Sequence, residues 1–304
     1  MYFVRRLIFA VPLLLIISAL AFSLMHLAPG GPFDSERAPA SPEIERNLRA
    51  KYHLDEPIWK QYLEYLHDLA RGDFGVSLKY RDHTVSDIIE QGLPVSATLG
   101  TLAFGFAMGI GLPLGFFTAA RRGRWEDFAG SFLAILVVCI PGFVIAPVLI
   151  LLFAIKCRLL PVGLWETPWH MILPPIALGL FFAGKIARLM REGMLDAVQS
   201  EFVTAARAKG ISENRLLLKH AVRIAILPVI SYSGPMLADL LTGSFVIENI
   251  FQIPGIGVFF VNSSLNLDYP LLVGLSLLYA LLLIGMNLAV DFAYTMLDPR
   301  VRYE

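Results

Sequence analysis

Long apolar runs alternate with short polar stretches along most of this chain of 304 residues. The first apolar run covers residues 7–28, long enough to cross the roughly 30 Å of hydrocarbon in a bilayer as a helix. Comparable runs occupy residues 96–120, 128–155, 171–190, 225–247 and 271–296. This pattern predicts an all-α polytopic membrane protein with six transmembrane helices.

Composition agrees with a bilayer environment. Hydrophobic residues make up 56% of the chain and charged residues 16%, and the mean hydropathy is +0.65. A soluble core could not bury that much apolar surface, so membrane lipid is an expected partner. The formal net charge is zero, so no overall basic field favours binding to nucleic acid.

The positions of the charges predict the orientation. Arg5 and Arg6 precede the first run, which has no clear cleavage site, so we expect an uncleaved first helix with a cytoplasmic N-terminus. Lys and Arg gather in the connections that should face inward, at Arg121, Arg122, Arg124, Arg188, Arg191, Arg207, Lys209, Arg215, Lys219, Arg223, Arg300 and Arg302. The loop before the last run has Glu248 and Asp268 and no Lys or Arg. Lys156 and Arg158, in the connection between the third and fourth runs, go mildly against the rule but are outnumbered, so both termini are predicted to be cytoplasmic.

Residues 29–94 differ from the rest because they are polar and mixed in charge. Within residues 57–71 the apolar side chains recur at helical spacing, Pro57 suits a first helical turn and Gly72 suits a helix end. A second short helix is predicted at residues 42–53. The predicted organisation is therefore an N-terminal helix (1–28), an outward-facing helical insert (29–94), a transmembrane domain (95–296) with a cytoplasmic loop at 191–224, and a cytoplasmic tail (297–304).

The cytoplasmic loop contains the most informative motif, residues 201–210 with the sequence EFVTAARAKG. Its alanines favour a helix, Gly210 suits the left-handed position after a helix, and Ser212 is a plausible N-cap for a second helix at residues 213–226. A helix, a stop and a second helix, with small side chains at the tip, can project from the membrane and fit a groove on a partner. A basic helix resting on anionic lipid is the alternative explanation.

This motif resembles the coupling loop by which permeases of ATP-binding-cassette importers engage their ATPase subunits. The Ala-Ala pair, the later glycine and the Leu227-Pro228 step match, whereas Thr204 replaces the glutamate of the wider family. The resemblance assigns ATPase coupling to Glu201, Phe202, Ala205, Ala206, Arg207, Ala208, Lys209, Gly210 and His220.

Further matches cover nearly the whole chain, at residues 28–32 (APGGP), 71–77 (RGDFGVS), 248–251 (ENIF), 254–257 (PGIG) and 298–300 (DPR). In order, they resemble the B-type permeases of dipeptide and oligopeptide importers, and the oligopeptide members most. That resemblance implies a type I permease bundle with a periplasmic helical insert after the first helix. It also implies docking of a binding protein on the outer loops at Asp73, Phe74, Glu248, Pro254, Gly255 and Gly257.

The resemblance implies partners encoded elsewhere: a second, C-type permease, two ABC ATPase subunits and an extracytoplasmic peptide-binding protein. ATP and Mg would bind those ATPases, and no cofactor is expected in this chain. The sequence itself has no phosphate-binding G-x-x-x-x-G-K-[ST] loop, no H-E-x-x-H helix and no G-x-S-x-G elbow. A non-catalytic membrane subunit is therefore expected.

Several residues inside the predicted spans leave alternatives open. Gly105 with Gly109, and Gly111 with Gly115, form small-xxx-small pairs that could pack within this subunit or against the C-type permease. Asp239 could line the peptide pathway or form a hydrogen bond within the bundle.

Three other side chains have simpler expected roles. Lys185 is expected to extend to the inner membrane interface. Cys139 and Cys157 could not pair across one continuous helix, and neither has a second ligand at metal-binding spacing, so packing in an apolar interior is expected for both.

Other functions compete with this interpretation. Dipeptides, antimicrobial peptides, glutathione and nickel chelates are substrates of the same permease type. A self-sufficient secondary transporter or channel would be expected to show inverted repeats and clusters of intramembrane charges, which the sequence lacks. A membrane receptor or assembly factor would explain the outer insert but not the coupling motif.

Overall fold

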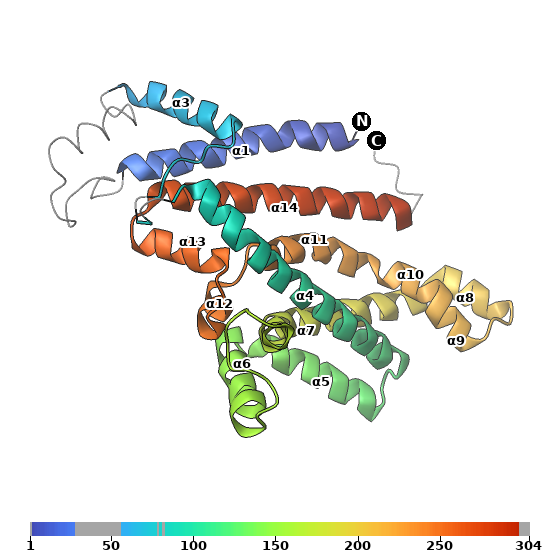
Figure 1. Cartoon of the computed structure of the whole chain (residues 1–304). Helices are drawn as coiled ribbons and strands as arrows, with labels where there is room; N and C mark the ends of the chain where they lie inside the picture. Colours follow the sequence, from blue (N-terminus) through green and yellow to red (C-terminus); the bar gives the residue numbers. More distant parts are fainter. Residues whose placement is uncertain (1, 28–55, 78, 81–82, 298–304) are drawn as a thin grey trace. The chain divides into compact units, whose positions relative to one another are not determined.

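A computed structural model describes residues 2–27, 56–77, 79–80 and 83–297 of the chain. The predicted helix at residues 42–53, the motifs at 28–32 and 298–300, and nearly all of the tail lie outside these residues. In the described part the regular structure is helical, apart from one isolated bridge between Val76 and Thr84, and the predicted all-α class is confirmed. The chain divides into two compact units, residues 1–92 with 259–281 and residues 93–258 with 282–304 (Figure 1).

The first unit combines α1 (Tyr2–Leu27), α3 (Ile58–Ala70), the start of α4 (Val85–Ala120), most of α13 (Ile256–Leu265) and the start of α14 (Tyr269–Leu297). α1 and α3 contact each other through the hydroxyls of Ser18 and Tyr62, 2.9 Å apart, and through the ring of Phe22 against that of Tyr62. Gly72 ends α3 with φ +80°, so the helix predicted at residues 57–71 is confirmed.

The second unit contains the remaining helices and is arranged around α7 (Leu173–Gln199). Three glycines bring α7 close to its neighbours: Gly179 faces Ala103 of α4, Gly184 faces Ala134, and Gly193 faces Ala225. The other elements are α5 (Trp125–Cys139), α6 (Gly142–Leu149), the π-helix η1 (Ile150–Lys156), the 3₁₀-helix η2 (Pro168–Met171), α8 (Glu201–Ala208), α9 (Glu213–Arg215), the π-helix η3 (Leu216–Ala221), α10 (Val222–Ala225), α11 (Leu227–Leu241) and α12 (Phe245–Phe251).

Two predicted spans are not continuous helices. The run at 128–155 bends by 104° between α5 and α6, because Ile140 is extended and Pro141 has no N–H to continue the helix. The run at 225–247 bends by 47° before α11 and ends at Leu241, and Gly243 with φ +80° then separates it from α12. Residues 245–247 therefore begin a separate short helix.

The boundary predicted between residues 94 and 95 falls inside α4. This helix already begins at Val85, where the Asp87 carboxylate accepts a hydrogen bond from Thr84 N at 2.8 Å and Asp87 N donates to the Thr84 hydroxyl at 3.0 Å. Pro94 lies on an exposed side of the helix, where its missing N–H is tolerated. The last part of the predicted insert is thus the first part of a long helix.

Membrane-spanning length is reached by three of the described helices, α4, η2 with α7, and α14. The number rises to as many as six when each bent pair of helices is counted as one span. The structure therefore supports a multi-pass membrane protein, and its set of candidate spans includes the pair α12–α13 but not α1.

The two small-xxx-small pairs in α4 differ. A Cβ on Gly111 would lie 2.7 Å from the carbonyl oxygen of Ala183, and one on Gly115 would lie 2.3 Å from that of Ala187, so this pair packs against α7. Gly105 and Gly109 face open space. The alternatives left open by the sequence therefore resolve in favour of internal packing for Gly111 and Gly115.

Burial of the two cysteines was a wrong prediction. Cys139 is the last residue of α5 and Cys157 follows η1, and both are free thiols with exposed side chains. The bend at Pro141 explains the difference, because it turns the two helical segments apart and leaves both ends on the surface of the chain.

Candidate functional site

The helix-stop-helix predicted for the cytoplasmic loop is present. α8 ends at Ala208, Gly210 has φ +77°, and Ser212 is the N-cap residue of α9. A side chain at position 210 would be strained in this left-handed conformation, which explains the glycine. The local signals for a helix, a stop and a second start therefore produce a helical hairpin, visible at one end of the second unit (Figure 1).

The hairpin has a buried side and an open side. Val203 and Ala206 of α8 pack against Leu216 of η3 and form a small core of their own. The other predicted coupling residues on α8 and after it are exposed, namely Glu201, Phe202, Ala205, Arg207, Ala208, Lys209 and Gly210. The exposed side thus carries small side chains next to charged ones, which suits close contact with a partner surface.

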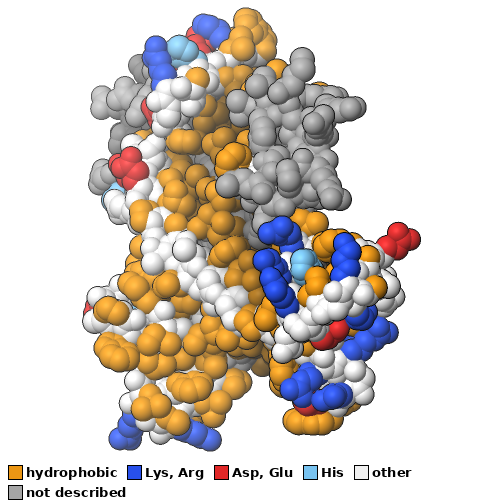
Figure 2. Space-filling view, turned by 90° about the vertical axis from the view of Figure 1, so that its right-hand side faces the viewer, with side chains coloured by type: hydrophobic (Ala, Val, Ile, Leu, Met, Phe, Trp, Pro, Cys, Tyr) orange, Lys and Arg blue, Asp and Glu red, His pale blue; other side chains and the backbone are white. Residues whose placement is uncertain are grey.

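Two side-chain pairs connect the arms of the hairpin. Arg207 donates from Nε and from a terminal nitrogen to the Glu213 carboxylate, at 3.1 and 2.8 Å, and this hydrogen bonding raises the pKa of Arg207. The ring of Phe202 meets the imidazole of His220 edge to face, with 5.7 Å between centroids. Figure 2 shows Lys and Arg side chains gathered on the face that carries α8 and α9.

The hairpin is attached to two helices that pack closely against each other. α8 follows α7 after the single residue Ser200, and a Cβ on Gly193 would lie 2.4 Å from the carbonyl oxygen of Ala225. The backbones of α7 and α10 are therefore in direct contact, and the two arms of the hairpin lead into these two helices.

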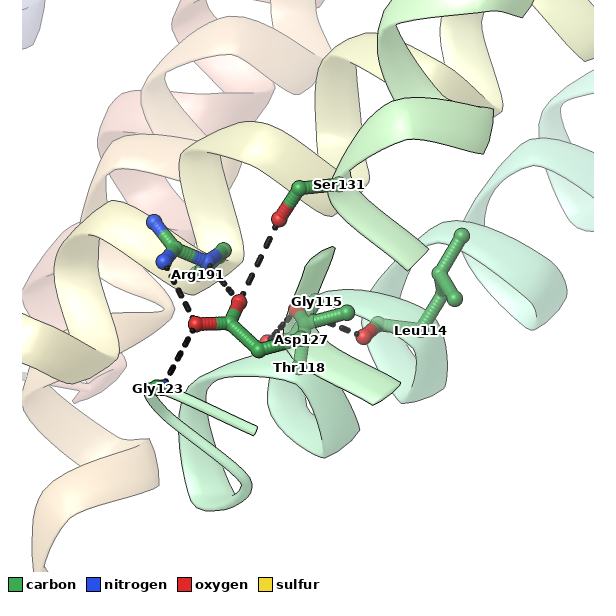
Figure 3. Close-up of polar contacts among 7 residues, drawn as sticks. All are labelled: Leu114, Gly115, Thr118, Gly123, Asp127, Ser131 and Arg191. Atoms are coloured by element: carbon green, nitrogen blue, oxygen red, sulfur yellow. Dashed lines mark hydrogen bonds and ion pairs between the residues drawn. The ribbon is translucent and has the colours of Figure 1, made fainter. Parts of the chain in front are cut away.

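An ion pair near this attachment was missed by the sequence analysis. Asp127, in the first turn of α5, accepts hydrogen bonds from Arg191 Nε at 2.7 Å and from a terminal nitrogen of Arg191 at 3.0 Å. Gly123 N and the Ser131 hydroxyl donate to the same carboxylate, at 3.1 and 3.3 Å (Figure 3). The acidic residue at the start of α5 was the available signal, but sequence spacing does not indicate its partner on α7.

The predicted docking residues differ in accessibility. Glu248 has no exposed area, and Gly255 and Gly257 are also buried, which corrects their expected position on the outer surface. Pro254 and Asp73 are exposed and Phe74 is half-buried. Asp73 and Phe74 belong to the first unit and the others to the second. A docking role for the accessible residues stays a prediction.

Burial of Glu248 has a clear physical basis. Its carboxylate accepts hydrogen bonds from the Ser96 hydroxyl at 2.7 Å and from Val258 N at 3.2 Å, and Ser96 in turn accepts from Ile256 N at 2.8 Å. Around the carboxylate, a Cβ would clash at each of three glycines, Gly243, Gly255 and Gly257. The PGIG motif therefore packs closely around the buried Glu248 carboxylate, and the hydrogen bonds of that carboxylate connect α4, α12 and the start of α13.

Two charged residues lie inside the helices of the second unit. Asp239 is near the end of α11 and its side chain is exposed, and its role stays a prediction. For Lys185, the expected extension to the inner membrane interface stays a prediction, and the structure gives the neighbours of its side chain. Its ammonium lies 4.5 Å from the centre of the Phe181 ring, one turn earlier in α7, and 5.6 Å from that of Tyr232. Attraction to the two aromatic faces explains this direction.

Comparison with known proteins covers the full chain. The family model described as "Binding-protein-dependent transport system inner membrane component" matches residues 111–303, and the corresponding N-terminal model matches residues 1–100. The oligopeptide transport system permease protein OppB of Haemophilus influenzae is 47% identical over 98% of both chains. The dipeptide transport system permease protein DppB of Bacillus subtilis is 42% identical over 99% of this chain and 97% of its own length.

A solved structure extends the comparison to the fold. A methionine ABC transporter in inward-facing conformations aligns with 71% of this chain and 97% of its own chain, with a TM-score of 0.53 and 19% identity. At that identity the likeness concerns the fold alone, and it confirms the permease bundle expected from the sequence. This chain belongs to the family of binding-protein-dependent transport system inner membrane components, the permease subunits of ABC importers.

Proposed function

We propose that this chain is the B-type permease of an oligopeptide importer and forms half of its membrane channel. The α8–α9 hairpin carries the proposal, because it presents a small, exposed helix joined to α7 through the single residue Ser200. The full-length similarity to oligopeptide permeases supports the substrate class. Dipeptides are the second candidate, favoured by the similarity to a dipeptide permease.

In the proposed topology six helices cross the inner membrane with both termini in the cytoplasm. The six spans are α1, α4, α5 to η1, α7, α10 to α11, and α14. α12 and α13 have 7 and 10 residues, too few for either to span alone, so they form an outward-facing connection. The inward connections then contain α8, with Arg207 and Lys209, in agreement with the positive-inside rule.

The proposed mechanism is alternating access driven by separate subunits. ATP and Mg bind two ABC ATPases, whose closure displaces α8, and α7 transmits this displacement to the bundle. The permease shares the channel with a C-type permease, and a periplasmic binding protein delivers the peptide. A lever of this kind requires that the ATPases contact α8 differently in their nucleotide states. Asp239, exposed on α11, is proposed to line the pathway.

Substitution of the hairpin tests the coupling role. Gly210→Pro should abolish peptide uptake, because proline cannot adopt φ +77°. Ala206→Glu should also abolish it by burying a charge in the core of the hairpin. Ala205→Glu is the sharper variant, because Ala205 is exposed and the hairpin keeps its fold while the contact surface changes. Glu192→Gln, an exposed change on α7, is the matched control.

The measurements are peptide uptake into cells, membrane insertion of the chain and co-purification with the ATPases. We expect normal insertion of all variants, loss of ATPase co-purification for Ala205→Glu, and unchanged uptake for Glu192→Gln. Full uptake by both Gly210→Pro and Ala205→Glu would refute the coupling role. Accumulation of peptide by the purified chain alone, in vesicles without ATPase, would instead refute the importer itself. Labelled peptides of graded length would distinguish oligopeptide from dipeptide uptake.

A further inference from the structure

Exposed positions on α7 and on α11 are occupied by polar and charged side chains, although most residues of the second unit are apolar. On α7, Lys185 is followed at helical spacing by Arg188 and Glu192, whose side chains are 52% and 59% exposed. On α11, Ser231 and Asp239 are exposed. Charged groups are costly against lipid tails, so such a side is expected to face water or a partner subunit.

Lys185 is the charged group with the most defined surroundings on this side. Its ammonium is held against the rings of Phe181 and Tyr232, from two different helices. The side chain is half-buried, and within the described residues its ammonium has no hydrogen-bond acceptor or ion-pair partner, so its three N–H donors are available to a ligand. Aromatic contacts are weaker than a charge-assisted hydrogen bond, so an approaching anion can still be bound by these donors.

The chemistry of such an anion follows from the proposed function, on which this inference rests. A permease that accepts peptides of many sequences can recognise only groups that all peptides share, which are the main chain and the two termini. The C-terminal carboxylate is the shared anion. We propose that Lys185, held between Phe181 and Tyr232, binds the C-terminal carboxylate of the peptide as it crosses the membrane.

The test uses the complete transporter in proteoliposomes, with ATP and with binding protein saturated with peptide. Initial uptake rates are measured for one tripeptide, its C-terminal amide and its N-acetyl form, which keeps the carboxylate. Lys185→Met and Lys185→Gln remove the charge, and Lys185→Arg keeps it. Lys156→Met, at an exposed lysine at the end of η1, is the matched control. Each variant is compared with wild type on the same loaded binding protein, so that protein's own selectivity cancels.

For the neutral variants we expect uptake of the free and the N-acetyl peptide to fall about tenfold, because one charge-assisted hydrogen bond is lost. Uptake of the amide should be unchanged. Lys185→Arg and Lys156→Met should keep the wild-type pattern. An equal fall for all three peptides, or no fall in either neutral variant, would overturn the carboxylate site while leaving the importer function intact. A wild-type complex that takes up none of the peptides would overturn the proposed function and this inference together.

Discussion

Two exposed surfaces of the second unit differ in chemistry although both belong to apolar helices. Along α5, α6 and η1 the large exposed side chains are hydrophobic, among them Phe128, Leu133, Val148 and Ile155. Along α7 and α11 the exposed positions include charged groups such as Arg188 and Asp239. The difference indicates that the first faces lipid tails and that the second faces a wetter environment or a partner.

A lysine placed on each surface gives the largest expected contrast. Leu133→Lys puts a charge in the middle of α5 and should oppose insertion by about 3 kcal/mol. Ser231→Lys, on the polar side of α11, should insert nearly as well as wild type. The measurement is the fraction of chain integrated into membranes. Equal integration of the two variants would show that the surfaces do not differ in their surroundings.

Removal of one arginine from each side of α7 should have a smaller effect. Arg191→Met leaves the buried Asp127 carboxylate without its bidentate partner. We expect the free energy of unfolding of the complex to fall by about 2 kcal/mol, less than for a fully buried pair, because Arg191 is partly exposed. Arg188→Met removes only an exposed contact with Glu192 at 3.8 Å and should change stability by less than about 0.5 kcal/mol. Thermal unfolding of the purified complex compares them, and a larger loss for Arg188→Met would reverse our assignment of the two sides.

The smallest expected difference in stability is between two glycines of α4. Gly111→Ala places a methyl group 2.7 Å from the Ala183 carbonyl oxygen and should cost about 1–2 kcal/mol through overpacking. Gly105→Ala meets nothing within 4 Å among the described residues and should leave the stability of this chain unchanged. The same unfolding assay applies. A defect of Gly105→Ala confined to assembly with the second permease would assign that glycine to the interface between subunits.

The sequence was informative wherever local preferences decide the structure. The end of α8 at Gly210 and the start of α9 after Ser212 depend on neighbouring residues, and both were predicted. The helix at residues 58–70 was predicted for the same reason.

Contacts between distant segments were not predictable in the same way. Glu248 is polar and lies among loop signals, so it was assigned to the surface, but its partner Ser96 is 152 residues away. The direction of Lys185 depends on Tyr232, which comes from another helix. In both cases tertiary packing determines the environment, and no alternation or spacing along the chain encodes it.

The bend at Pro141 also has an experimental consequence. The only two cysteines of the chain lie on either side of it, Cys139 before and Cys157 after, and both thiols are accessible. Spin labels or a pair of fluorophores attached to these native thiols would report the angle of the elbow without any engineered substitution. The distance between them during nucleotide turnover would reveal whether this part of the permease stays rigid or straightens as the transporter works.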